Sequence, residues 1–565
     1  MSYVITGGCC NDASCVAVCP VDCIRPHPED PAFRTTEQLY IDPGTCIDCS
    51  ACMFACPVSV IHDGFELPDH LSEFRDLNAE YFAQTPLDRR FVDTEPAATP
   101  APAKARIAVV GSGPAACYAI AELCRVPGIE ISVFERLPTP FGLVRSGVAP
   151  DHPRTKQISE TFQSTLDLES VTCYFNVEVG TDVDLDELKR SHHAVIYAAG
   201  AHSDRSLDIG GEALPGSCSA REFVSWYNGH PDFTDHQHDF SADTAVIIGN
   251  GNVALDVARS LVSPIEVLET TDMADHAVAA LRGSAVDTVV IAARRGPADA
   301  ACTSAELLEL CQLPGVEVGV VPDEIAEIAE LEGPLNSAQQ RKLEIFSRLP
   351  DGRRSGTAPM KRIIFRFGMT PQDIVGIGKV DSITFRQPAG RRTETIRCGL
   401  VIRAVGYRVI EFPGLPFDQS TRTIANQAGR VVDEKEGRVH PGLFCVGWAK
   451  RGATGVIGTN KVCSQETVAA LLEDLKSGNL PEPTLDTDDL DGLIRSRQPN
   501  VVDRDGWNTI DAEERRRGGD GGASRVRRKI VNVEEMLRLI DSSAAAAVLT
   551  TRSQTESADQ QVTDR

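Results

Sequence analysis

The chain has 565 residues, enough for about three or four domains, and 42% of them are hydrophobic, so each domain can bury a core. The formal net charge of −25 argues against nucleic acid as a partner, because binding a phosphate backbone needs a basic surface. There is no apolar run of about 18 residues and the N-terminus lacks the basic and apolar regions of a signal peptide, so we expect a cytoplasmic protein without a membrane span.

Cysteines crowd the beginning of the chain. Nine of the 18 lie between Cys9 and Cys56, and the other nine are scattered from Cys117 to Cys463. A secreted disulfide scaffold is typically short and carries a signal peptide, and this chain has neither property. The crowded segment, residues 1–62, therefore predicts a metal-binding domain, and the scattered cysteines are interpreted as small buried side chains.

One run of cysteines has a specific spacing. Residues 46–57 read C-x2-C-x2-C-x3-C-P, a run that resembles bacterial two-cluster ferredoxins, in which the fourth cysteine ligates the other cluster. A partner run, C-x2-D-x2-C-x3-C-P, covers residues 9–20. Exchange of the fourth ligands predicts two iron–sulfur sites, one with Cys19, Cys46, Cys49 and Cys52 and the other with Cys9, Cys15 and Cys56. A zinc ribbon is less favoured, since zinc usually uses two separated C-x2-C pairs.

Asp12 stands where the second cysteine of the partner run belongs. A carboxylate is a harder and poorer ligand for iron than a thiolate. The site is therefore expected to hold either a 3Fe–4S cluster, which we slightly favour, or a 4Fe–4S cluster with Asp12 on a labile iron; a simple turn residue is the third interpretation. Cys10 is an alternative to Cys9 as a ligand, and Cys23 is interpreted as a packed free thiol.

The next segment, residues 63–105, connects the cysteine-rich domain to the rest of the chain. Its acidic part predicts a helix, on one face of which we place, loosely, Leu71, Phe74, Leu77 and Phe82. Residues 94–104 form a Pro/Ala linker with nothing to bury. From residue 106 to about residue 480, apolar strands alternate with helical stretches, which indicates an α/β architecture.

The first dinucleotide-binding pattern follows an apolar strand at residues 106–110 and reads G-x-G-x-x-A. Gly111 allows a tight turn, and Gly113 lets a pyrophosphate approach the backbone. The next strand ends in Glu135, whose carboxylate can accept hydrogen bonds from both ribose hydroxyls. Because a carboxylate there would repel a 2′-phosphate, this site predicts FAD.

A second pattern of the same kind follows the strand at residues 245–248. Its loop, Gly249, Asn250, Gly251 and Asn252, opens a helix. The strand after that helix is followed by Arg294 and Arg295 where the first unit has its acid. Guanidinium groups bind a 2′-phosphate, so this site predicts NADPH rather than NADH. The alternative is that both arginines are ordinary surface residues.

Two nucleotide domains with the second inserted in the first are the layout of a flavoprotein reductase. The fold class is therefore an α+β ferredoxin-like domain followed by an α/β reductase with two Rossmann-like domains. We expect an FAD-binding domain in residues 106–200 and 406–480, an NADP-binding domain in 201–405, a C-terminal extension in 481–540 and a disordered tail in 541–565.

Several motifs resemble the adrenodoxin reductase family of ferredoxin–NADP reductases. They are Phe141–Arg145, Val148–Pro153, Asp204–Arg205, Gly249–Arg259, Arg294–Pro297 and Gly447–Ile457. Residues 106–470 carry this resemblance, and the whole chain resembles a two-cluster ferredoxin fused to such a reductase. One departure is Gly452-Ala-Thr-Gly455, where family members usually carry Gly-Pro-Thr-Gly.

The resemblance implies roles for matching residues. FAD contacts are expected from Ala115, Glu135, Leu143, Val179, Trp448, Gly455, Val456 and Ile457. NADP contacts are expected from Arg205, the Gly249–Asn252 loop, Arg294, Arg295, Glu306 and Gly455. His152 and Glu306 are similar to polar residues near the flavin–nicotinamide contact, although a structural role at a helix start is an equal alternative for His152.

The activity that the resemblance implies is that of a ferredoxin–NADP(+) reductase. Hydride would pass from NADPH to FAD, and single electrons would then pass through the clusters to an external acceptor protein of the ferredoxin or cytochrome type, or in reverse. A small reductase subunit of an amidotransferase complex such as glutamate synthase is the alternative enzyme, and a flavin-binding scaffold or redox sensor is the non-enzyme alternative. The motifs Phe141–Pro153 and Gly447–Ile457 argue against the amidotransferase reading.

Overall fold

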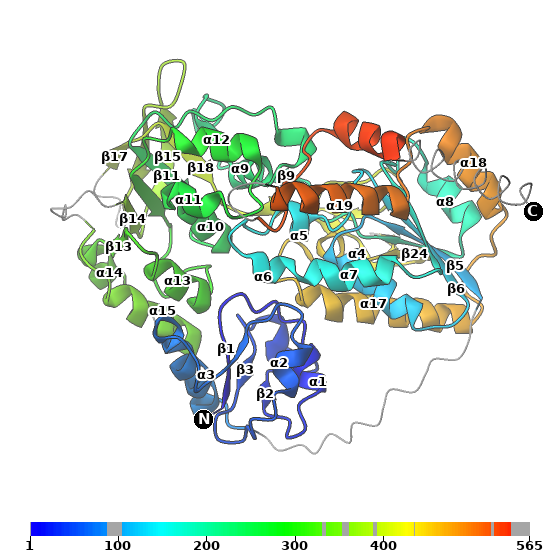
Figure 1. Ribbon diagram of the computed structural model, residues 1–565, viewed down its shortest axis with the longest axis horizontal. Helices are drawn as coiled ribbons and strands as arrows, with labels where there is room; N and C mark the ends of the chain where they lie inside the picture. Colours follow the sequence, from blue (N-terminus) through cyan, green and yellow to red (C-terminus); the bar gives the residue numbers. More distant parts are fainter. Residues whose placement is uncertain are drawn as a thin grey trace, which may run out of the picture.

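The computed structural model describes residues 2–87, 104–329, 335–352, 361–387, 393–433, 435–520 and 525–543. Residues 94–103 of the predicted linker and residues 544–565 of the predicted tail lie outside these ranges. Figure 1 shows the N-terminal domain beneath two larger α/β domains that lie side by side. No helix within the described ranges is long and apolar enough to cross a membrane.

The N-terminal domain is built around two loops that carry the cysteine runs. Its strands pair as β1 (Tyr3–Ile5) with β4 (Ile61–Asp63) and β2 (Ile24–Arg25) with β3 (Tyr40–Ile41), and its short helices are α1 (Ser14–Ala17) and α2 (Ala51–Ala55). The two loops have the same backbone shape: Asn11 and Ala13 have φ of 55° and 61°, and Asp48 and Ser50 have φ of 53° and 63°. Asp12 thus occupies the backbone position that Cys49 occupies in the other loop.

Helix α3 (Glu73–Gln84) closes this domain. It buries Phe74, Leu77 and Phe82, whereas Leu71 lies in the 3-10 turn that precedes it. Asn78 ties the helix to two strands, because its Oδ1 accepts the N–H of Ile41 at 2.9 Å and its Nδ2 donates to the carbonyl of Ile5 at 2.9 Å. A buried amide that makes both bonds fixes the helix on the sheet.

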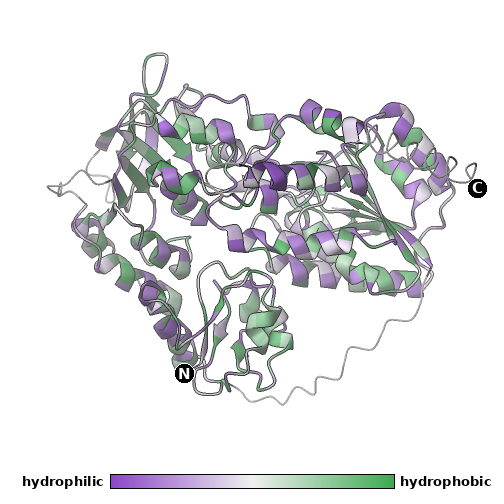
Figure 2. Cartoon of the chain, viewed as in Figure 1, coloured by the Kyte–Doolittle hydropathy of each residue, from purple (hydrophilic) through white to green (hydrophobic). Residues whose placement is uncertain are grey.

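A seven-stranded sheet forms the first nucleotide domain, in the order β22-β23-β24-β8-β5-β6-β7. Its strands are β5 (Ala105–Val110), β6 (Ile129–Glu135), β7 (Val171–Phe175), β8 (Ala194–Tyr197), β22 (Asn426–Gln427), β23 (Arg430–Val432) and β24 (Val439–Cys445). The helices used below are α4 (Pro114–Cys124), α5 (Leu143–Ser146), α6 (Pro153–Lys156), α7 (Ile158–Leu166), α16 (Trp448–Arg451) and α17 (Thr459–Lys476). The strands from β24 to β7 are parallel and hydrophobic (Figure 2), as expected for a sheet covered on both faces.

A six-stranded parallel sheet forms the second nucleotide domain, in the order β10-β18-β11-β12-β14-β13. Its strands are β10 (Ser217–Ser219), β11 (Thr244–Ile248), β12 (Thr288–Ala292), β13 (Val316–Val320), β14 (Lys361–Arg366) and β18 (Leu400–Arg403). Its helices include α9 (Ala220–Tyr227), α10 (Asn252–Val262), α12 (Asp275–Arg282), α13 (Ser304–Cys311) and α15 (Ser337–Ser347), and a separate antiparallel sheet contains β15 (Thr370–Val375), β16 (Ser382–Arg386) and β17 (Thr393–Arg397). The chain enters and leaves this domain through a two-stranded ribbon of β9 (Ser203–Asp204) and β19 (Tyr407–Arg408).

The N-terminal domain also contacts this second nucleotide domain. Glu37 accepts the backbone N–H of Ser304, at the start of α13, at 2.7 Å and pairs with Lys342 of α15 at 2.7 Å. Arg341 of α15 donates to Glu80 of α3 at 2.9 Å. The N-terminal domain is therefore held by charged contacts on the side that faces α13 and α15.

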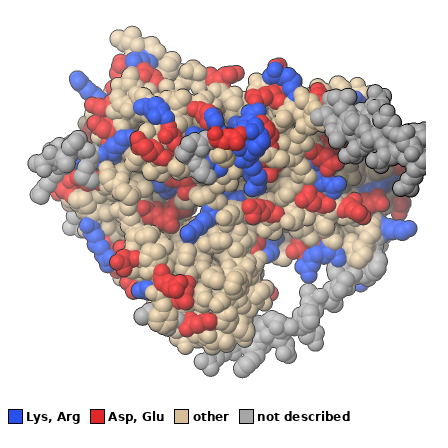
Figure 3. Space-filling model, viewed as in Figure 1, with Lys and Arg blue, Asp and Glu red and all other residues tan. Residues whose placement is uncertain are grey.

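The C-terminal extension folds back onto the first nucleotide domain through α18 (Thr487–Arg497) and α19 (Arg504–Gly519). Trp507, Ile530 and Met536 are buried in the same core as α4. Figure 3 shows Lys and Arg side chains interspersed with Asp and Glu over this face of the molecule, α19 included. The extension thus shares the hydrophobic core of the first nucleotide domain.

Glu514 of α19 is fully buried between two arginines. Its carboxylate accepts hydrogen bonds from Arg145 at 2.9 Å, from Arg527 at 3.1 Å and from the backbone N–H of Ile530 at 2.9 Å. Burial alone would raise the pKa of Glu514, but the two guanidinium groups outweigh it and keep the pKa below its usual value.

We expect Glu514→Gln to lower the free energy of unfolding by about 3–5 kcal/mol, because it leaves the two arginine charges without a carboxylate. Thermal and denaturant unfolding, followed by circular dichroism, measure this effect. The matched control is Glu513→Gln, whose pairs with Arg516 and Arg517 are nearer the surface and should contribute less than about 1 kcal/mol. Equal destabilisation by both variants would contradict the buried-pair interpretation.

Candidate functional site

Three of the predicted motifs meet at the N-terminus of α4. Gly111 has φ of 101° at the end of β5, and Gly113 is the residue before the helix. A Cβ on Gly142 would lie 3.0 Å from the Cα of Gly113, and a Cβ on Gly447 would lie 2.5 Å from the Cβ of Ala115. A Cβ on Gly113 itself would meet no described atom within 4 Å, so there is open space before the helix. This space fits a pyrophosphate at a helix N-terminus.

Glu135 is fixed beside this turn, at the end of β6. Its Oε2 accepts hydrogen bonds from the backbone N–H of Ser112 at 3.1 Å and from the hydroxyl of Ser112 at 2.6 Å, and its Oε1 accepts the N–H of Leu137 at 3.1 Å. The carboxylate is therefore oriented next to the glycine turn, as a ribose-binding acid requires. Leu143 begins α5 on the same side, and Val179 is buried in the core behind β5 and β6.

The predicted flavin loop, residues 447–457, is closed by its own hydrogen bonds. The indole N–H of Trp448 donates to the carbonyl of Thr454 at 3.1 Å, and Gly455 has φ of 81°. The N–H of Val456 donates to the hydroxyl of Thr459 at 3.1 Å. The loop ends at Ile457, shortly before α17, and Ile457 packs against a hydrophobic core that the N-terminal domain shares with the first nucleotide domain.

The second glycine loop is tied to the segment that carries Glu306. Gly249 has φ of 112°, and Gly251 precedes α10. The side-chain oxygen of Asn250 accepts the N–H of Ala301 at 3.3 Å, and that of Asn252 accepts the N–H of Thr303 at 2.8 Å. Arg294 and Arg295 are exposed just after β12, and Arg205 is exposed beside the β9–β19 ribbon. Their guanidinium groups are accessible to a phosphate ligand.

His152 lies at the junction of the two nucleotide domains. Its Nε2 is 3.3 Å from Oδ1 of Asp256 and 3.5 Å from Oε2 of Glu306. His152 precedes α6 in the first domain, whereas Asp256 and Glu306 belong to α10 and α13 in the second. Arg259, with its side chain only 6% exposed, contacts His152, Asp256 and Asp151. The arrangement is a buried cluster of alternating charges between the domains.

The charges around His152 set its protonation. Burial lowers the pKa of His152, but the carboxylates of Glu306 and Asp256 outweigh it and raise the pKa to about 9. Burial, the larger cause, and the negative charge of nearby Glu306, the smaller one, together raise the pKa of Glu309 to about 7. The sequence analysis named His152 and Glu306 as candidate site residues but missed Arg259 and Asp256, although both belong to the predicted Gly249–Arg259 motif.

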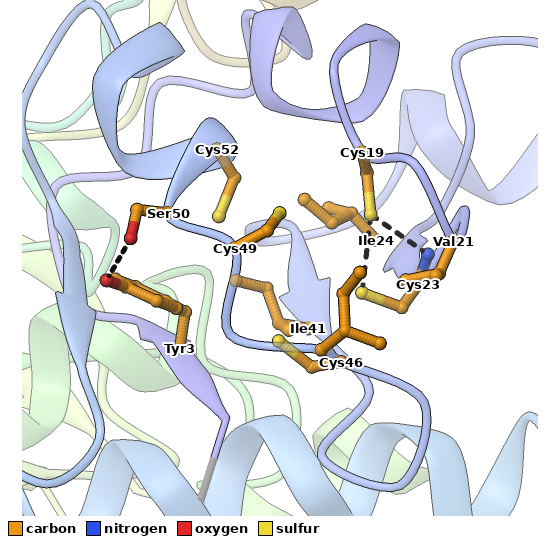
Figure 4. Close-up of a pocket in the computed structure, with 11 residues that line it drawn as sticks. Tyr3, Cys19, Val21, Cys23, Ile24, Ile41, Cys46, Cys49, Ser50 and Cys52 are labelled. Carbon is orange, nitrogen blue, oxygen red and sulfur yellow. Dashed lines mark hydrogen bonds between the residues drawn. The ribbon is translucent and has the colours of Figure 1, made fainter.

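The first cysteine site is a cavity lined by the predicted ligand set. Figure 4 shows the sulfurs of Cys19, Cys46, Cys49 and Cys52 directed towards one cavity, which fits a cluster held by four thiolates. Cys23 is buried, as expected for a packed thiol, but it lines the same cavity, and its Sγ is 3.4 Å from that of Cys19. Hydrogen bonding from Cys23 lowers the pKa of the Cys19 thiol.

The second predicted set, Cys9, Cys15 and Cys56, also comes together. Burial first, and the nearby Cys56 thiol in smaller part, raise the pKa of Cys9 to about 11. Burial, with Cys9 and Cys56, raises the pKa of Cys15. Three mutually close thiols fit a cluster with three cysteine ligands. The carboxylate of Asp12 accepts hydrogen bonds from the Tyr118 hydroxyl at 3.1 Å and from Lys461 Nζ at 3.1 Å.

Comparison with known proteins finds a family match for the N-terminal domain and another for the nucleotide-binding part of the chain. Residues 8–60 match the family described as 4Fe-4S dicluster domain, and residues 104–306 match the family described as pyridine nucleotide-disulphide oxidoreductase. The chain is 45% identical over 553 residues to a probable ferredoxin/ferredoxin–NADP reductase of Mycobacterium tuberculosis, covering 95% of this chain and 94% of that protein. It is 40% identical to the mitochondrial NADPH:adrenodoxin oxidoreductase of Homo sapiens, covering 77% and 92%.

Among solved structures, FprA of Mycobacterium tuberculosis in complex with NADPH is 40% identical, with a TM-score of 0.71. The match covers 77% of this chain and 99% of that chain. Together with the family matches, this similarity confirms the predicted fold class, a two-cluster ferredoxin-like domain followed by a reductase with two dinucleotide-binding domains.

Proposed function

The chain belongs to the ferredoxin/ferredoxin–NADP reductase family, and we propose that it connects NADPH to an external one-electron acceptor protein through FAD and two iron–sulfur sites on one polypeptide. The observation that carries this proposal is the hydrogen bond from the N–H of Gly458 to the carbonyl of Cys10, at 2.6 Å. It supports the proposal because it joins the residue that follows the predicted flavin loop to the loop of a predicted cluster site. The acceptor is proposed to be of the ferredoxin or cytochrome type.

The reductase subunit of an amidotransferase complex is the weaker alternative. The similarity to ferredoxin–NADP reductases extends over 95% of the chain, and both family matches fall within it. The fused N-terminal domain provides electron carriers within the chain, so a large catalytic partner subunit is not needed to complete the activity.

The nucleotide sites are proposed from the geometry above. FAD would be held by Gly111, Gly113, Ala115, Glu135, Leu143, Val179, Trp448 and Gly455–Ile457, and NADPH by Arg205, Gly249–Asn252, Arg294, Arg295 and Glu306. When bound, these groups supply hydride transfer and one-electron release. The protein would supply position: Glu135 would accept hydrogen bonds from ribose hydroxyls, and the two arginines would donate to the 2′-phosphate.

The buried cluster around His152 is proposed to orient groups at the junction of the two sites. Arg259 and Asp256 hold the imidazole ring beside Glu306, across the boundary between the domains. The raised pKa, about 9, favours a protonated His152 imidazole at neutral pH, and its Nε2 lies near both carboxylates and in contact with the guanidinium group of Arg259. His152, as a proton donor, and Glu306, as an acceptor, would thus be held in a fixed orientation in direct contact with each other.

The cysteine sets are proposed as ligands of two different clusters. Cys19, Cys46, Cys49 and Cys52 would hold a 4Fe–4S cluster, and Cys9, Cys15 and Cys56 a 3Fe–4S cluster. The engagement of Asp12 by Tyr118 and Lys461 favours the three-iron form over a form in which Asp12 ligates a fourth iron. The clusters supply one-electron transfer when bound.

Removal of residues 1–103 tests this function. The truncated protein is expected to retain FAD and NADPH-driven reduction of ferricyanide but to reduce cytochrome c about a hundredfold more slowly than the full chain, because the tethered electron carriers are lost. Parallel steady-state assays with the two acceptors measure the difference. The full-length chain should reduce both acceptors. Cytochrome c reduction at the full rate without residues 1–103 would show that the ferredoxin is not on the electron path.

A further inference from the structure

The loop that carries Asp12 rests on the FAD-binding domain through its backbone. Gly458 donates to the carbonyl of Cys10 at 2.6 Å, and Lys461 Nζ donates to the carbonyl of Asp12 at 2.9 Å. A Cβ on Gly458 would lie 1.9 Å from the carbonyl oxygen of Asn11. The residue that follows the predicted flavin loop must therefore be glycine for the two segments to approach this closely. In Figure 1 the N-terminal domain lies beneath α6 and the left end of α17.

The side chain of Asp12 strengthens this contact. It is only 7% exposed, and its Oδ2 accepts hydrogen bonds from Tyr118 of α4 and from Lys461 of α17, both at 3.1 Å. Its Oδ1 accepts the N–H of Ser14 at 3.1 Å, and the Ser14 hydroxyl also contacts it. A buried carboxylate is costly unless it is paired and hydrogen-bonded, and here each oxygen has a donor.

The twin loop shows that the backbone does not dictate this use of Asp12. Cys49 has the equivalent position in a loop with nearly the same φ angles, and its thiol lines the first cysteine cavity. The first loop has an aspartate there, and the aspartate pairs with the reductase domain instead. The two cysteine sites therefore differ in one side chain, and that side chain is the one that contacts α4 and α17.

We propose that Asp12 is a positioning residue that fastens the Cys9, Cys15 and Cys56 site to α17 and α4 of the FAD-binding domain through Lys461 and Tyr118, so that this site, rather than the Cys19, Cys46, Cys49 and Cys52 site, is presented to FAD. This inference rests on the proposed function of the fused ferredoxin. Asp12 stands where this cluster site lacks a thiolate. The same side chain thereby sets the orientation of the site towards the reductase domain.

Lys461→Met and Tyr118→Phe test this proposal in the full-length protein loaded with FAD and clusters. Both variants leave Asp12 and every cysteine unchanged. We expect amide hydrogen exchange in residues 9–15 to rise about tenfold in Lys461→Met, because a charge-assisted contact of that loop is lost. After rapid mixing with NADPH, freeze-quenched EPR should show cluster reduction slowed by about tenfold or more. Ferricyanide reduction should be unchanged.

Lys476→Met, in the last turn of the same helix, is the matched control and should resemble the wild type in all three measurements. Asp12→Asn combined with Lys461→Met should be no slower than the slower single variant, because both remove the same contact. Tyr118→Phe removes only one hydroxyl and keeps the test valid if Lys461→Met loses FAD.

Wild-type exchange and wild-type cluster reduction in both Lys461→Met and Tyr118→Phe would overturn the proposal. Multiplied effects in the double variant would also overturn it, since Asp12 and Lys461 would then act independently. If NADPH fails to reduce the clusters of the wild type itself, the proposed function fails instead, and the exchange measurement still decides whether Asp12 fastens the loop.

Discussion

Replacing Arg294 and Arg295 together by alanine is expected to raise the KM for NADPH by about 10²–10⁴-fold and to leave the KM for NADH nearly unchanged, because each charge-assisted hydrogen bond to the 2′-phosphate contributes about 1.5–3 kcal/mol. Both side chains are exposed after β12, in the domain that contains the Gly249–Asn252 loop. NADH has no 2′-phosphate, so it gains nothing from either guanidinium group. Steady-state kinetics with ferricyanide and each nucleotide give the ratio.

The matched control is the double variant Arg386→Ala plus Arg397→Ala, which removes two exposed arginines from the separate sheet of β16 and β17. It changes the net charge equally and should keep the wild-type preference. A wild-type NADPH/NADH ratio in the Arg294/Arg295 variant would show that these residues do not read the phosphate. A similar loss in both double variants would indicate a general electrostatic effect instead.

The two glycine turns and the acid beside the first of them could be predicted because their geometry is local. A turn that needs a positive φ usually has glycine at that position, so the sequence indicates where it lies. Gly111 and Gly249 have φ of 101° and 112° at the ends of β5 and β11. The residue at the end of the next strand decides which nucleotide fits. That residue is Glu135, whose carboxylate accepts a hydrogen bond from Ser112, the residue after Gly111. Short-range pattern and short-range structure therefore agree.

The contacts that join the domains could not be predicted, because they connect residues far apart in sequence. Asp12 is 449 residues from Lys461. Nothing in the spacing of the first cysteine run indicates that the aspartate in place of its second cysteine pairs with a lysine of α17. Glu37 is likewise 267 residues from Ser304, whose backbone N–H it accepts at the start of α13. The pattern of a single sequence does not indicate which surfaces of two domains contact each other.

Replacing Asp12 by cysteine is expected to abolish the near-isotropic EPR signal that a three-iron cluster gives in the air-oxidised protein, and to raise the iron content by about one atom per chain. The substitution completes the C-x2-C-x2-C-x3-C-P run on a loop whose backbone already matches that of the other run, with φ of 55° and 61° against 53° and 63°. A thiolate is a better ligand for iron than a carboxylate, so the vacant corner should fill. EPR together with iron and acid-labile sulfide analysis measures both effects.

Asp12→Asn is the matched control, because it keeps the size of the side chain and supplies no thiolate, and it should keep the wild-type signal. Two ordinary four-iron clusters in the wild type would contradict the three-iron proposal and favour Asp12 as a ligand, despite its bonds to Tyr118 and Lys461. A wild-type spectrum and iron count in the cysteine variant would mean that the side chain at position 12 does not reach the cluster. The pairing of the runs at residues 9–20 and 46–57 would then have to be redrawn, since that pairing is what places position 12 at the vacant corner.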